Sequence, residues 1–183
     1  MGLDMYLYAS RSAYDFGERK EEYKELESFV HSQMMGSVLP RDPNVFESIE
    51  VTVNVAYWRK ANAIHHWFVD HVQGGVDECQ LSYVGDEELE RLISVSGKVV
   101  NILEPYFRDV GEYDEVSIPE EVVEEVMELL PTSDGFFFGS TEIGPWYYDD
   151  IVYTHNRLRE VLDWVKSERS DDRYWDIRYQ ASW

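Results

Sequence analysis

The chain has 183 residues, of which 37 are acidic and 16 basic, so its formal net charge is -21. This length suits one domain with its own core, and the 44% hydrophobic content excludes a disordered acidic tail. The charge would repel phosphates, so we expect no direct binding to nucleic acid or to a membrane surface. We expect a cytoplasmic protein, because no apolar run reaches the roughly 18 residues of a membrane span and no signal peptide precedes the first strand.

Hydrophobic periodicity predicts an α+β fold with a small, mostly antiparallel sheet. Alternating side chains predict strands over residues 2–8, 48–55 and 176–183. Helical spacing and helix-end signals predict helices over residues 18–35, 57–72, 86–103, 117–130 and 144–166, with Pro105 ending the third. The prediction is a single globular domain over residues 1–183, with four or five helices covering the sheet.

One segment stands out because Val51 to Val69 contains no acidic residue in this acidic chain. On the expected helix 57–72, Arg59, Asn62, His66 and Asp70 would share a polar face. A guanidinium binds phosphate or carboxylate through parallel hydrogen bonds, and aromatic rings stack on planar ligands. An equally weighted interpretation is structural, with the cations paired to carboxylates and the histidines at the core edge. The candidate ligand-binding residues here are Trp58, Arg59, Lys60, Asn62, His65, His66 and Trp67.

A second candidate segment runs from Thr132 to Thr141, where two glycines flank three phenylalanines. Its hydroxyls and backbone amides suit a ligand-binding loop, although it lacks the Gly-Lys-Ser/Thr of a phosphate-binding loop. A buried hairpin with turn residues at each end is the equal alternative. The candidate residues added by this segment and the following helix are Thr132, Ser140, Thr141 and Tyr148.

No metal or other cofactor is expected. His66 and Asp70 lie four residues apart, but the His-Glu-x-x-His pattern and further ligands at diagnostic spacing are lacking. The single cysteine, Cys79, excludes an intramolecular disulfide, and we interpret it as a small buried hydrophobe.

Several long motifs of this chain resemble an uncharacterised family of phage, prophage and bacterial proteins. The resemblance implies a phage-associated origin and carries no activity. The motifs are MGLDMYL at 1–7, YWRKANAIHHWFV at 57–69, DEC at 77–79, LLPT at 129–132, GFFFGST at 135–141 and YQASW at 179–183.

Three functions are consistent with these patterns. The first is a protein that binds a small anionic, nucleotide-like ligand, with interference in host defence as a biological setting. The second is an acidic interaction module that mimics DNA and inhibits a nucleic-acid enzyme, with a basic host protein as partner. It would use the carboxylates of helix 119–130. The third is an enzyme with a histidine general base, which we rank last because no nucleophile, base and orienting group form a set.

Overall fold

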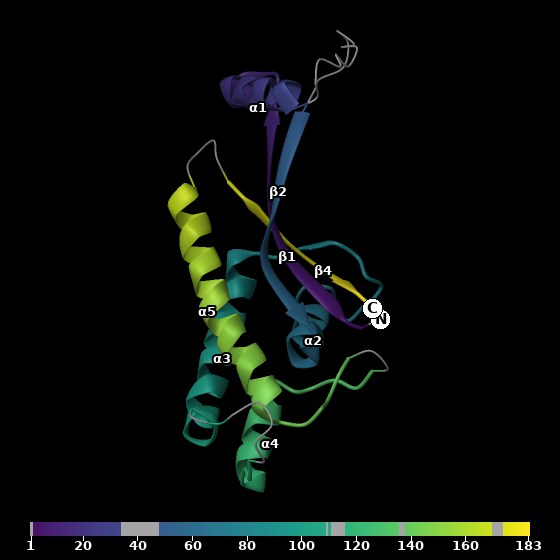
Figure 1. Cartoon of the computed structure of the whole chain (residues 1–183), viewed down its shortest axis with the longest axis vertical. Coiled ribbons are helices and arrows are strands. Elements are labelled where there is room, and N and C mark those ends of the chain that lie inside the picture. The colour runs from purple at the N-terminus through teal and green to yellow at the C-terminus, as the bar shows by residue number, and fades with distance from the viewer. Residues whose placement is uncertain (1, 34–47, 109, 111–115, 136–137, 170–173) are drawn as a thin grey trace.

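The computed structural model describes residues 2–33, 48–108, 110, 116–135, 138–169 and 174–183. These residues form one four-stranded antiparallel sheet, five α-helices and a short 3-10 helix (Figure 1), which confirms the predicted α+β class. The strands are β1 (Asp4–Tyr14), β2 (Ser48–Arg59), β3 (Ser82–Tyr83) and β4 (Asp176–Ser182). The helices are η1 (Gly17–Arg19), α1 (Lys20–Gln33), α2 (Asn62–His71), α3 (Asp86–Phe107), α4 (Glu120–Leu129) and α5 (Pro145–Glu168).

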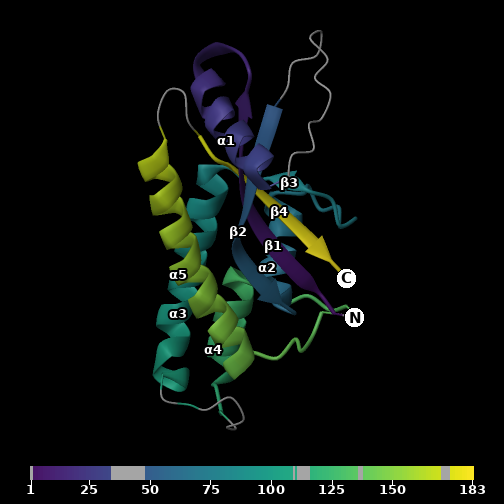
Figure 2. The ribbon, with the colours of Figure 1, turned by 45° about the horizontal axis from the view of Figure 1, so that its top comes forward.

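The sheet has the strand order β2-β1-β4-β3, so β1 pairs with two neighbours. Asp4 lies opposite Ser182, and the two ends of the chain are therefore adjacent, as Figures 1 and 2 show. The strands predicted at 2–8, 48–55 and 176–183 are all present, although β1 and β2 are longer than predicted. They extend together toward α1 as a two-stranded ribbon (Figure 1).

One face of the sheet forms the core with the helices. From Leu3, the residue before β1, to Ala9 within it, alternate side chains are fully buried, as expected for an antiparallel sheet with a single covered face. They belong to one hydrophobic cluster with inward side chains of α2, α3 and α5. Helices α3 and α5 run antiparallel, side by side (Figures 1 and 2). In the part of the chain that the structure describes, no helix has both the length and the apolar character needed to cross a bilayer.

The predicted helix over 57–72 is wrong at its start, because Tyr57 to Arg59 belong to β2. These residues pair with Tyr6, Met5 and Asp4 of β1, and the helix begins only at Asn62. Burial of the Trp58 side chain in the core, where it is 2% exposed, favours this pairing over the local helical pattern. Arg59 therefore lies outside the helix that carries Asn62, His66 and Asp70.

A β-bulge explains why β2 changes its inward-facing positions. Leu7 lies opposite Ala56, whereas Tyr8 lies opposite Asn54, so Val55 is an extra residue in β2. Val55 and Ala56 are consequently both buried, and the next inward side chain is that of Trp58. The bulge thus brings Trp58 into the core and sends Tyr57 and Arg59 to the exposed side.

Helix α3 passes through Pro105 to Phe107, so the prediction that this proline ends the helix is wrong. A proline at this position removes one backbone hydrogen bond and crowds the carbonyl four residues before it, and the helix continues for two residues beyond it. Phe107 is 4% exposed in the core, and burial of its ring offsets this loss.

Candidate functional site

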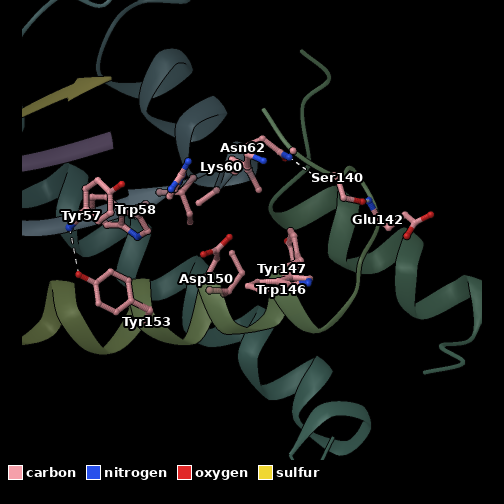
Figure 3. Close-up of a pocket in the computed structure, with 16 residues that line it drawn as sticks. Tyr57, Trp58, Lys60, Asn62, Ser140, Glu142, Trp146, Tyr147, Asp150 and Tyr153 are labelled. Atoms are coloured by element: carbon pink, nitrogen blue, oxygen red, sulfur yellow. Dashed lines mark hydrogen bonds between the residues drawn. The ribbon is translucent and has the colours of Figure 1, made fainter. Parts of the chain in front are cut away.

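A cavity of about 690 Å³ opens where the end of β2, the start of α2 and the first turns of α5 meet (Figure 3). Its volume lies in the range of small-molecule sites. The residues that line it come from three segments of the chain: Tyr57–Ile64, then Gly139, Ser140 and Glu142, and finally Trp146, Tyr147, Asp150, Ile151 and Tyr153.

A tight turn at Lys60 separates β2 from α2. Lys60 has a left-handed backbone, with φ of 62°, and the N–H of Asn62 donates to the carbonyl of Lys60 at 2.9 Å. Between them Ala61 has the angles of an inverse γ-turn. The Lys60 N–H also donates to the carbonyl of Leu3 at 2.8 Å, which joins the turn to the chain before β1. The turn places two consecutive cations, Arg59 and Lys60, beside the cavity.

Gly139 packs directly against this turn. A Cβ atom added to Gly139 would lie 3.1 Å from the Lys60 Cβ and 3.3 Å from the Lys60 carbonyl oxygen. Gly139 also has φ of 89°, which side chains other than glycine rarely adopt. Both properties require glycine at this position in the cavity wall.

Asn62 holds the 133–140 segment against α2. Its side-chain amide donates to the carbonyls of Phe138 and Ser140 at 3.1 and 2.7 Å, and its side-chain oxygen accepts from the Ser133 N–H at 3.2 Å. Only 3% of Asn62 is exposed. Its polar atoms therefore build the cavity wall, although the residue was predicted to contact ligand.

The opposite wall is one face of α5. Trp146 is 60% exposed, whereas Tyr147 is buried and donates from its hydroxyl to the carbonyl of Leu130 at 2.7 Å. Burial also raises the pKa of the Tyr147 phenol. Further along α5, the Tyr153 hydroxyl accepts from the Tyr57 N–H at 3.3 Å, which connects the helix to the edge of β2. Aromatic side chains thus border the cavity on both sides.

A chain of hydrogen bonds fixes Trp58 to α5. The Trp58 indole N–H donates to the Thr154 hydroxyl at 2.9 Å, and this hydroxyl donates to the backbone carbonyl of Asp150 at 2.6 Å. Trp58 and Thr154 are both buried. Trp58 therefore anchors the wall, and the more accessible Trp146, Tyr57 and Tyr153 are better placed for stacking on a ligand.

Asp150 carries the acidic group in the centre of the cavity. Figure 3 shows its carboxylate pointing from α5 toward the turn that carries Lys60. Burial, and then the neighbouring charge of Asp149, raise the pKa of Asp150 from 3.8 to about 7. Within the described residues, no side chain or backbone N–H donates to this carboxylate, and no cation lies within ion-pair distance.

Arg59 and Lys60 have exposed side chains, and neither forms an ion pair or a side-chain hydrogen bond with the residues that the structure describes. Most of the other described cations do have such partners. Elsewhere, Arg157 pairs with Glu160, Lys166 with Glu90, and Arg169 with Asp86. The structural interpretation, in which these two cations pair with carboxylates, is therefore not seen among the residues described.

Five of the predicted site residues lie together at the cavity, and the others do not. Trp58, Arg59, Lys60, Asn62 and Ser140 line it. The other six predicted residues are not among the described residues that line the cavity: His65, His66, Trp67, Thr132, Thr141 and Tyr148.

The two histidines of the motif lie in different environments. His65 is 1% exposed; its Nδ1 lies 2.8 Å from the Tyr179 hydroxyl, and its Nε2 lies 3.0 Å from an oxygen of Asp77. His66 is half-buried on the other side of α2, with its Nε2 3.4 Å from Asp70. Both ring nitrogens of His65 thus have partners inside the fold, which is a structural arrangement.

The remaining predicted residues have local packing partners. Trp67 stacks on His71, with ring centroids 4.6 Å apart. The Thr132 hydroxyl donates to the carbonyl of Thr141 at 3.1 Å and so closes the loop between them. Tyr148 stacks on Phe107 of α3. For the buried hairpin considered at 132–141, none of the described residues of this segment forms a strand, and residues 136–137 lie outside the described part.

The candidate residues predicted from α5 included Tyr148 but not the residues of this helix that line the cavity. Trp146, Tyr147, Asp150 and Tyr153 are spaced by one, three and three residues, which places them along one helix face. The sequence contains this spacing, but it also fits a helix that merely packs its aromatic residues. Only the cavity distinguishes the two.

Within the described residues, no group of three or more histidine, cysteine, aspartate or glutamate side chains is arranged to hold a metal ion. No protein-family model, curated protein or solved structure matches this chain. The geometry of the cavity is therefore the main indication of function.

Proposed function

We propose that the protein binds a small planar ligand with an anionic group, of the nucleotide class, in the cavity between β2 and α5. The observation that carries the proposal is the pair of exposed cations, Arg59 and Lys60, next to an aromatic-walled cavity. In a chain with a net charge of -21, surface cations have many possible carboxylate partners. Two adjacent cations without such partners among the described residues are available for a ligand anion.

Aromatic residues beside the cavity support the planar part of the proposed ligand. Tyr57, Trp146 and Tyr153 lie at the cavity with 40% to 60% of their surfaces exposed. An exposed ring beside a cavity gains most when a planar ligand stacks on it. A nucleotide combines a planar base with a phosphate and so matches both features.

We propose binding and not catalysis. The biological setting that we propose is the one implied by the resemblance of the sequence motifs to phage and prophage proteins. In that setting the protein is cytoplasmic and phage- or prophage-associated, and it sequesters a nucleotide-like molecule that serves host defence.

A thermal-shift screen tests the proposal. The panel contains nucleoside monophosphates, cyclic nucleotides, ADP-ribose-type nucleotides and divalent metal ions. A ligand at a hundred times its dissociation constant stabilises the folded state by about 2.7 kcal/mol, which raises the melting temperature by several degrees. Arg59→Ala should lose the shift, whereas Arg159→Ala, which removes an exposed arginine from the middle of α5, should keep it.

One observation favours a second candidate function. Glu120, Glu121, Glu124, Glu125 and Glu128 are all exposed on α4. This carboxylate stripe suits a basic protein groove that normally holds DNA. Two results together would favour this function over the first. No nucleotide in the screen would raise the melting temperature, and the protein would capture a basic nucleic-acid enzyme at low salt and release it at high salt.

A further inference from the structure

The carboxylate of Asp150 is half-buried in the cavity and has no hydrogen-bond donor among the described residues. The backbone carbonyl of this residue accepts from the Thr154 hydroxyl, but within the described residues nothing donates to its side-chain oxygens. A carboxylate has several acceptor positions, and those that the protein does not fill are available to donors of a ligand. Since the group points into the cavity (Figure 3), a bound molecule can supply the missing donors.

The shape of the acceptor restricts the donor. An ionised carboxylate offers two oxygens side by side and accepts two parallel hydrogen bonds. Among the common nucleobases, only guanine presents two adjacent N–H donors on one edge, from N1 and the exocyclic amino group. Adenine presents one donor beside one acceptor there, which leaves one carboxylate oxygen facing a lone pair.

The geometry points to Asp150 as the specificity-determining residue of the cavity, which selects guanine-type nucleotides over adenine-type nucleotides. This inference rests on the proposed nucleotide-binding function. The base edge would meet Asp150, the base plane would stack on the aromatic residues of α5, and the phosphate would meet Arg59 and Lys60. These groups all line the same cavity.

The protonation state of Asp150 gives the selectivity a recognisable pH dependence. The pKa of this carboxyl is raised to about 7 by burial and by Asp149. The ionised form accepts two hydrogen bonds, whereas the protonated form donates one and accepts one. Guanine therefore fits the form present above pH 7, and adenine fits the form present below it.

An asparagine at this position reproduces the hydrogen-bonding pattern of the protonated form at every pH. Its amide group donates from nitrogen and accepts at oxygen. Asp150→Asn should therefore weaken GMP binding and strengthen AMP binding. This gain distinguishes altered recognition from a general loss of the site, because a damaged cavity would bind both nucleotides less well.

The experiment is calorimetric titration of the wild type and of Asp150→Asn with GMP, IMP and AMP at pH 8.5 and pH 5.5. At pH 8.5 the wild type should bind GMP roughly tenfold or more tightly than AMP. IMP, which lacks the exocyclic amino group, should fall between them. The GMP-to-AMP affinity ratio should drop at pH 5.5 in the wild type and stay constant in the variant. Taking this ratio removes the contribution of the phosphate, which titrates equally in both ligands.

Asp149→Asn is the matched control, because it makes the same chemical change at the exposed neighbouring residue. It should keep the GMP preference, and thermal unfolding should show that both variants fold. Equal GMP and AMP affinities in the wild type, with Arg59-dependent binding of both, would overturn the role of Asp150 and leave the proposed function intact. No binding of any nucleotide would overturn both.

Discussion

The side-chain amide of Asn62 donates a 2.7 Å hydrogen bond to the backbone carbonyl of Ser140, 78 residues further along the chain. This bond, with those to Phe138 and Ser133, fixes the loop before α5 to the first turn of α2. The cavity thus has a wall whose position depends on one buried amide.

At position 62, truncation of the side chain should therefore destabilise the fold less than replacement of the donating amide by a carboxylate, which can only accept. Asn62→Ala leaves two carbonyls and one N–H without partners, and should lower the free energy of unfolding by about 2–3 kcal/mol. Asn62→Asp points a carboxylate at the carbonyls of Phe138 and Ser140, and should cost more. Chemical denaturation of both variants measures the order. Equal stability of Asn62→Asp and the wild type would show that these bonds do not hold the wall.

Gly139 should be sensitive to a single methyl group. Gly139→Ala combines the strain of a left-handed backbone, about 1 kcal/mol, with crowding against Lys60. Gly75→Ala separates the two effects, because Gly75 has φ of 78° and open space around it. Gly139→Ala should destabilise the fold more than Gly75→Ala in parallel thermal melts and should also weaken nucleotide binding. Identical effects of the two substitutions would mean that the contact with Lys60 is unimportant.

Asp150 should make the stability of the protein fall as the pH rises. The pKa of Asp150 is raised in the folded state from 3.8 to about 7, so the folded protein keeps the proton between these values after the unfolded chain has lost it. The stabilising contribution of this bound proton is therefore lost progressively from about pH 4 to pH 7. The full loss, on the order of 4 kcal/mol, is present above pH 7.

Asp150→Asn removes this proton linkage. The variant should be more stable than the wild type at pH 8 and similar to it near pH 4, as measured by denaturant unfolding at each pH. Comparison of the two proteins cancels the general repulsion among the other carboxylates. A stability difference that does not change between pH 4 and pH 8 would contradict the raised pKa of Asp150.

The two tryptophans of the cavity should respond in opposite ways. Trp146 is 60% exposed, so Trp146→Ala should change the free energy of unfolding by no more than about 0.5 kcal/mol. It should weaken ligand binding by the 1–3 kcal/mol typical of base stacking, which is roughly five- to 150-fold. Trp58→Phe loses the buried bond to Thr154 and should instead destabilise the fold by about 1–3 kcal/mol. Unaltered affinity in Trp146→Ala would exclude stacking on this ring.

The acidic face of α4 should be dispensable for nucleotide binding. Replacing Glu121, Glu124 and Glu128 by glutamine removes three exposed negative charges that lie outside the cavity lining. Nucleotide affinity should remain within a factor of about two, whereas inhibition of a nucleic-acid enzyme by charge mimicry would be lost. Titration and an enzyme-inhibition assay of the same variant separate the two candidate functions.

Local sequence patterns predicted most of the elements but not the junction that forms the cavity. Alternation placed β2 at 48–55, yet its true end at Arg59 depends on pairing with Asp4, more than 50 residues away. The bulge at Val55 and the left-handed turn at Lys60 leave no local signature. The stretch without acidic residues around Arg59 does coincide with a segment that lines the cavity.

The role of α5 as a wall of the cavity could not be predicted either, and the reason is different. An aromatic and acidic helix face has the same spacing whether it packs or borders a cavity, and only its position opposite β2 decides between these roles. His65 illustrates the reverse case, because a motif rich in histidine suggested ligand contacts. Its two nitrogens instead have Asp77 and Tyr179 as partners.

The proposed function places the anionic group of a planar ligand at the Arg59 end of the cavity. The decisive measurement is calorimetric titration of the wild type, Arg59→Ala and Arg159→Ala with the nucleotide that gives the largest thermal shift. The wild type and Arg159→Ala should bind with the same affinity, and Arg59→Ala should bind at least roughly tenfold more weakly. Equal affinity of all three proteins, or no binding by the wild type, would show that Arg59 does not bind the ligand.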